Sequence, residues 1–228
     1  DAFRLEMTNA CKAALRVDPA SNTSLMMLWK LLAEEKETPN AERMRQLMLE
    51  SVATCIEVQP TNKRAWVMLA TMLTGIKGLG LVRDDAGDTD SIDTALTGVE
   101  DDDLEVDKGA EMFATNPIDE ATIRQVFDDE RRWWPETFFR VTDKRATLTV
   151  GEIRRPSSEE IVWLRVHYVV MAVLYPGKPT DARFRQVKER LDYIESKDFA
   201  SDTYKAFSAR IKETAKRRRD LYGRMLNP

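Results

Sequence analysis

The sequence predicts an all-α protein in which an N-terminal α-solenoid of helical hairpins is followed by a C-terminal helical bundle. Apolar residues recur at steps of three and four in most segments, turns containing proline separate these segments, and part of the pattern returns after 41 residues. We expect the hairpins at residues 1–134, interrupted by an acidic, mostly disordered insertion at about 78–108. Residues 135–156 are expected to form a linker or a short β-hairpin, and residues 157–228 the bundle.

The composition is typical of a helix-rich chain without a membrane span. Apolar residues make up 43 % and charged residues 32 % of the sequence, as in many globular proteins. The longest apolar run, residues 161–175, is interrupted by Arg165 and His167. It is also shorter than the roughly 20 residues that a bilayer requires. We therefore expect this run to be a buried helix.

Four helices are expected before residue 75. The first two hairpin turns contain Asp18-Pro19 and Gln59-Pro60, where the residue before proline avoids the α region. Polar residues that can cap the next helix follow Pro19 (Asn22 to Ser24) and Pro39 (Asn40). The expected helices cover residues 3–17, 25–36, 41–58 and 63–73.

Seven residues recur identically 41 positions further along the sequence, which indicates an internal repeat of a pair of helices. Conservative matches extend it, since Leu15 corresponds to Ile56 and Leu25 to Trp66. The identical pairs are Arg4 and Arg45, Met7 and Met48, Val17 and Val58, Pro19 and Pro60, Met27 and Met68, Leu28 and Leu69, and Leu32 and Leu73.

Two stretches carry this repeat, AALRVDPASNTSLMML and TCIEVQPTNKRAWVML. In the second, a small residue (Cys55) precedes the turn proline (Pro60), and an aromatic residue (Trp66) and a leucine (Leu69) follow it. These spacings resemble the tetratricopeptide repeat family, and the resemblance covers about residues 3–75. It implies a scaffold of stacked helices that binds segments of other proteins, and it implies no chemistry.

The sequence departs from the family pattern in two places. Its period is 41 residues, whereas the family period is about 34. The small residue that usually follows the leucine is Ala70 in the second stretch but Trp29 in the first. The partner-binding positions that the resemblance implies are Lys30, Arg64 and Thr71.

The helical pattern stops after residue 74. Gly75, Gly78 and Gly80 disfavour a helix, and eleven acidic residues lie between positions 84 and 107. Low hydrophobicity with high charge indicates a disordered insertion. Beyond it we expect a short helix at residues 109–114 and a longer one at 118–134, which together with Pro117 resemble a degenerate third turn.

The C-terminal third begins with two short β-branched stretches, FFRVT and ATLTV. They are equally consistent with a β-hairpin and with an extended linker. Residues 158–174 form the most apolar expected helix, so we place it at the centre of the bundle. Further helices are expected after Thr180 and from Ser201 or Asp202.

The cysteines and the single histidine are interpreted as structural. Cys11 and Cys55 lie on apolar helix faces without the spacing of metal ligands, and free cysteine behaves as a small buried apolar group. No disulfide framework is indicated, so a reducing compartment is expected. His167 lies in an apolar helix without neighbouring ligands. We expect no catalytic residue, no cofactor and no small-molecule substrate.

The acidic insertion does not have the pattern of a calcium loop. Counted from Asp88, such a loop needs glycine at the sixth position and glutamate at the twelfth, where the sequence has Asp93 and Val99. A solvated acidic loop is therefore the preferred interpretation. A metal-dependent enzyme remains a third hypothesis, which would use the acids Asp84, Asp85, Asp88, Asp90 and Asp93.

Charge is distributed unevenly along the chain. The net charge is −4, with +1 in residues 1–80, −14 in 81–130 and +9 in 131–228. The densest basic run lies near the C-terminus, where a solvated helix end is the plain interpretation. The candidate contacts for phosphate or an acidic protein surface are Arg154, Arg155, Arg210, Lys216, Arg217, Arg218 and Arg219.

The preferred function is that of a non-catalytic interaction or scaffold subunit of a larger assembly, whose partners are other protein subunits. The alternative is an RNA-binding accessory protein that uses the basic C-terminal region. The sequence starts at Asp1 without a methionine. If a transit peptide has been removed, the mitochondrial matrix is the expected compartment, and otherwise the cytoplasm.

Overall fold

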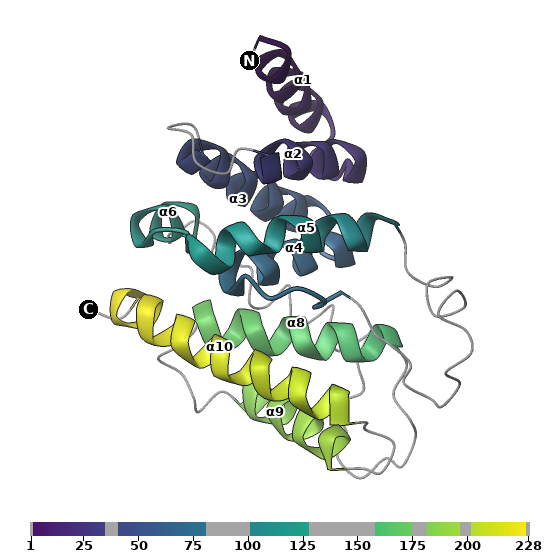
Figure 1. The fold of residues 1–228 in the computed structure, drawn as a ribbon, viewed down its shortest axis with the longest axis vertical. Coiled ribbons are helices and arrows are strands. Elements are labelled where there is room, and N and C mark those ends of the chain that lie inside the picture. Colours follow the sequence, from purple (N-terminus) through teal and green to yellow (C-terminus); the bar gives the residue numbers. More distant parts are fainter. Residues whose placement is uncertain are drawn as a thin grey trace. The chain divides into compact units, whose positions relative to one another are not determined.

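The computed structural model describes residues 2–34, 41–80, 101–127, 158–174, 182–196 and 202–226 (Figure 1). Every regular element in these ranges is an α-helix, so the all-α class is confirmed for the described part of the chain. The helices fall into two compact units, α1 to α6 and α8 to α10. The predicted domain boundaries near residues 134 and 156, and the predicted β-hairpin, lie outside the described ranges.

The first unit begins with the four helices that the periodicity predicts. The second of them starts three residues earlier than expected, because Ser21 accepts a hydrogen bond from the backbone N–H of Ser24 and so caps it. The helices of this unit are α1 (Ala2–Val17), α2 (Asn22–Glu34), α3 (Ala41–Val58), α4 (Lys63–Thr74), α5 (Asp101–Thr115) and α6 (Glu120–Val126).

The turns between α1 and α2 and between α3 and α4 have the same hydrogen bonds at a distance of 41 residues. In each, three backbone bonds link the end of one helix to the start of the next, and a side-chain oxygen at the same position caps the second helix. In the first turn, the backbone N–H groups of Asp18, Ser21 and Leu25 donate to the carbonyl oxygens of Ala14, Asp18 and Ser21, respectively. In the second turn, those of Gln59, Asn62 and Trp66 donate to the carbonyl oxygens of Cys55, Gln59 and Asn62.

The second turn is further fixed by the buried side chain of Asn62. Its Nδ2 donates to Asn22 Oδ1 at 2.8 Å and to Cys55 Sγ at 3.4 Å, so it connects α2, α3 and α4. The indole Nε1 of Trp66 donates to the carbonyl oxygen of Pro60 at 2.8 Å. The aromatic residue six places after the proline thus satisfies a carbonyl that the turn leaves without a helical partner.

Helix α5 corrects the prediction for the acidic insertion. The helix begins at Asp101 rather than at Gly109, so residues 101–108 are helical. Val106, Ala110 and Phe113 are buried at steps of four and three, which places one apolar stripe on the core. Burial of this stripe outweighs the low helix propensity of Gly109.

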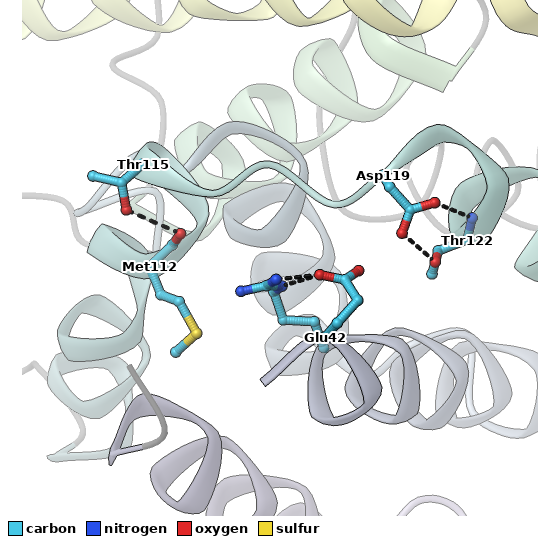
Figure 2. A network of polar contacts seen from close by, with 6 residues as sticks. Glu42, Met112, Thr115, Asp119 and Thr122 are labelled. Atoms are coloured by element: carbon cyan, nitrogen blue, oxygen red, sulfur yellow. Dashed lines mark hydrogen bonds and ion pairs between the residues drawn. The ribbon is translucent and has the colours of Figure 1, made fainter. Parts of the chain in front are cut away.

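Helix α6 is shorter in the described residues than the helix expected at 118–134. Asp119 caps it, accepting hydrogen bonds from the backbone N–H of Thr122 at 2.9 Å and from its hydroxyl at 2.7 Å (Figure 2). The hydrogen bond from the Thr122 hydroxyl is the main reason that the pKa of Asp119 is lowered, although partial burial acts the other way. The helix packs on α3, where Gln46 Nε2 donates to Gln125 Oε1 at 3.3 Å.

Helices α2, α3, α4 and α5 enclose the core of the first unit. Each packs against the next, and α5 packs against both α4 and α2. The contact with α2 is made by Trp29, whose ring centroid lies 5.4 Å from that of Phe113. Gly109 lies directly under the Trp29 indole, since an added Cβ would be 2.5 Å from Trp29 Nε1. Helix α1 packs against α2 from outside this group of four.

The second unit contains α8 (Ser158–Leu174), α9 (Ala182–Glu195) and α10 (Asp202–Leu226), each packed against the other two. Helix α8 has the bounds that the sequence predicts and is buried from Glu160 to Leu174. His167 within it is fully buried, as expected for a structural residue.

Buried charges in the second unit are paired or stacked. Arg190 of α9 contacts Glu160 of α8 at 3.4 Å, and their side chains are 1 % and 2 % exposed. The guanidinium of Arg165 lies 4.7 Å from the ring centroid of Phe207, which is a cation–π contact between α8 and α10. These contacts reduce the large cost of removing charge from water.

Gly109→Ala tests the contact between α5 and α2. Alanine in place of glycine normally stabilises a helix interior by roughly 0.5–1 kcal/mol. Here we expect a loss of about 1–3 kcal/mol instead, because the new methyl group overlaps the Trp29 indole. Chemical denaturation measures the change.

The matched background is Trp29→Leu, in which the smaller side chain leaves room for the methyl group. We expect Gly109→Ala to cost much less there than in the wild type. An equal cost in both backgrounds would show that the indole is not what requires glycine at this position.

Candidate binding groove

A groove of about 900 Å³ lies between α1 and α3 in the first unit. One wall is a single face of α1, the other is a face of α3, and Leu31 of α2 lies between them. The lining residues are Arg4, Leu5, Thr8, Asn9, Lys12, Leu15, Arg16, Pro19, Leu31, Arg43, Met44, Gln46, Leu47, Glu50, Ser51 and Thr54.

The floor of the groove is apolar. Leu15, Leu31 and Met44 line it and are themselves buried, while Leu47 is half-buried. Leu5 lies at the rim with 64 % of its surface exposed. An apolar floor with a polar rim is the usual make-up of a site that receives a ligand or a protein segment.

Positive charge predominates around this floor. Arg4, Lys12 and Arg16 come from α1 and Arg43 from α3, whereas Glu50 is the only carboxylate among the described lining residues. The groove thus carries a formal charge of +3 in a chain whose net charge is −4.

A hydrogen-bonded glutamine orders the α3 wall. Gln46 Nε2 donates to Glu50 Oε1 at 3.0 Å as well as to Gln125 of α6. The Thr54 hydroxyl donates to the carbonyl oxygen of Glu50 at 2.9 Å. Gln46 therefore links the groove to the packing of α6 on α3.

None of the three residues that the family resemblance singles out lines this groove. Lys30 is exposed on α2, Arg64 is half-buried on α4, and Thr71 is fully buried on α4. Thr71 is therefore not accessible to a partner in this structure, and the roles of Lys30 and Arg64 stay predictions.

Two exposed or half-exposed leucines lie outside the positions that the resemblance to the repeat family singles out. Leu5 and Leu47 are leucines outside the buried stripes of their helices, and basic residues accompany them. Single exposed leucines are common on protein surfaces, so this signal becomes specific only where the groove brings Leu5 and Leu47 together.

The basic run near the C-terminus does not gather on one face of α10. Arg210 and Arg217 are two turns apart and share one side, whereas Lys212, Lys216 and Arg219 share another. Glu213 and Asp220 lie between the two sides and pair with Arg217 and Arg219 at 3.7 and 3.9 Å. Arg218 is half-buried, and Arg154 and Arg155 lie outside the described residues.

Asp192 of α9 joins α9 to α10. It accepts hydrogen bonds from Lys188 on its own helix at 2.7 Å and from Lys212 of α10 at 2.5 Å. Partial burial raises the pKa of Asp192, but the two lysines outweigh it, so the pKa is lowered overall. Lys212 is thereby engaged within the second unit.

The cysteines are buried thiols, as the sequence analysis expects. Burial, together with the charge of Asp18, raises the pKa of Cys55 to about 11, although the Asn62 hydrogen bond acts in the opposite direction. Burial also raises the pKa of Cys11. Both thiols are therefore protonated and unreactive near neutral pH.

Neither a metal centre nor a membrane span is found in the described part of the chain. Its His, Cys, Asp and Glu side chains form no group of three or more that could hold a metal ion. Its helices are all too short or too polar to cross a bilayer. The acids from Asp84 to Asp93 lie outside the described ranges.

Comparisons with protein-family models, curated proteins and solved structures found no match.

Asp192→Asn should lower thermal stability at pH 7 by removing the contacts with Lys188 and Lys212. The loss should be at most about 1 kcal/mol, because these groups remain partly exposed. Since the pKa is lower in the folded state, the stabilisation is complete above the ordinary value of about 3.9 and disappears as the pH falls through the folded value. Thermal unfolding between pH 7 and pH 3 measures this.

Glu189→Gln removes an exposed carboxylate from the same helix and serves as the control. A difference between Asp192→Asn and wild type that stays constant down to pH 3 would contradict the role of the carboxylate charge.

Proposed function

We propose that this protein is a non-catalytic interaction subunit, and that the groove between α1 and α3 receives a segment of a partner protein. The observation that carries the proposal is the groove itself, with its apolar floor and charged rim. At about 900 Å³ it is at the upper end of the range of ligand sites, which runs from roughly 300 to 1,000 Å³.

The accessibility of the groove supports this function. Leu5, Arg16 and Arg43 are exposed, and Leu47 is half-buried. A partner that covers Leu5 and Leu47 removes apolar surface from water, worth roughly 25 cal/mol per Å² before the cost of association. The groove can therefore contribute binding energy without any rearrangement of the buried core.

The scaffold part of the proposal is supported by the repeated turn. The hydrogen bonds of the first turn recur 41 residues later, from Asp18 and Ser21 to Gln59 and Asn62. Stacked helical hairpins with such turns expose long surfaces to partners. The arrangement proposed is tetratricopeptide-like in its turns, with α5 packed across α2 as an addition to that pattern.

Leu47→Glu tests the groove as the partner site. The substitution places a charge on the apolar surface of α3 without entering the core, because Leu47 is half-buried. We expect partners that co-purify with the wild-type protein at low salt to be lost, while the helical circular dichroism is unchanged. Quantitative mass spectrometry of the captured proteins is the measurement.

Arg64→Glu is the matched comparison, since it changes the position that the family resemblance implies for a partner. Loss of the partner with Leu47→Glu alone assigns binding to the groove. Loss with Arg64→Glu alone would instead locate binding on α4 and contradict the groove. Retention of all partners by both variants would contradict the proposed function.

A further inference from the structure

We propose that the occupant of the groove is an extended acidic segment of a partner protein, about five or six residues long, in which acidic and apolar side chains alternate. This inference rests on the proposed function and specifies the chemistry of the partner. Three features carry it: the excess of cations, the length of the groove, and the absence of aromatic rings from its described lining.

The charge of the groove selects for an acidic occupant. Arg16 near the end of α1 and Arg43 near the start of α3 are exposed cations on opposite walls. Lys12 and Arg4 add to the α1 wall, and Glu50 is held by Gln46 on the α3 wall. Carboxylates of a bound segment would meet arginine on both sides, and arginine is well suited to carboxylate hydrogen bonding.

The length of the groove limits the length of its occupant. The α1 wall runs from Arg4 to Arg16, which at 1.5 Å per residue is about 18 Å.

An extended segment matches the arrangement of apolar and charged surfaces. Alternate side chains of an extended chain point in opposite directions. Apolar residues at every second position would face Leu15, Leu31 and Met44, and the acidic residues between them would face the cations of the rim. About 18 Å of groove corresponds to five or six residues at roughly 3.3 Å each.

A protein segment is favoured over RNA. Single-stranded nucleic acid is usually held by aromatic rings on which the bases stack. The described lining residues of the groove include no aromatic ring, and the floor is aliphatic.

The experiment measures fluorescence anisotropy of labelled peptides with the full chain. The probe is an eight-residue peptide that alternates leucine with glutamate or aspartate, acetylated and amidated to remove terminal charges. The control peptide has the same sequence with glutamine and asparagine in place of glutamate and aspartate. We expect the acidic peptide to bind at least about tenfold more tightly at low salt, with the advantage shrinking as sodium chloride is raised.

Arg16→Glu combined with Arg43→Glu should weaken binding of the acidic peptide about tenfold or more, because two attractions become repulsions. The neutral peptide should be affected much less. Lys77→Glu is the control, since Lys77 is an exposed cation of the same unit outside the groove, and it should leave both affinities within about twofold. Circular dichroism checks that each variant is folded.

Each outcome bears on a different statement. One outcome is that both peptides bind equally and independently of salt, and that Leu47→Glu abolishes this binding. That result would keep the groove as a partner site but would overturn the inference that it selects acidic segments. Binding of neither peptide would overturn this inference, while the capture experiment decides the proposed function separately. Tight binding of a labelled poly-uridine RNA, lost in the Arg16→Glu and Arg43→Glu double variant, would replace the peptide with nucleic acid and overturn the inference.

Discussion

The contact of the Trp29 indole with the backbone of α5 is the constraint on which the first unit depends. Because an indole occupies this position on α2, α5 can cross it only where it has no side chain, and Gly109 meets that requirement. The crossing lets Phe113 pack against Trp29 and encloses the core between α2, α3, α4 and α5. Helix α1 is then left outside, attached through α2, and its free side forms one wall of the groove.

The second turn adds a polar constraint to this apolar one. Asn62 caps α4 with its side-chain oxygen while its nitrogen donates to Asn22 and to Cys55. One buried side chain therefore fixes α2, α3 and α4 relative to one another. Hydrogen bonds in a buried site are costly to leave unmade, so Asn62 holds the end of α3 close to the starts of α2 and α4.

The helices of the repeat could be predicted from the sequence because proline, capping residues and apolar spacing act locally. The same signals place α8 at its observed bounds. The start of α5 could not be predicted, because Asp101 to Gly109 contains acidic residues and a glycine that disfavour helix when taken alone. Tertiary burial of Val106, Ala110 and Phe113 overrides that preference.

The groove could not be predicted from the sequence for a related reason. The family pattern directs attention to Lys30, Arg64 and Thr71, and burial then removes Thr71 from the surface. The groove instead depends on α1 and α3, and on α5 occupying the space across α2. Trp29 and Gly109 are farther apart in the sequence than one period of the repeat, so no pattern of neighbouring residues indicates that they are in contact.

The composition of the groove would let the proposed acidic segment gain from two kinds of surface at once. The floor is apolar, and the cations of α1 and α3 exceed the one carboxylate among the described lining residues by three. Carboxylates of such a segment would offset this charge while its apolar side chains cover the floor. A neutral apolar segment would gain from the floor alone, so charge is what would distinguish the two.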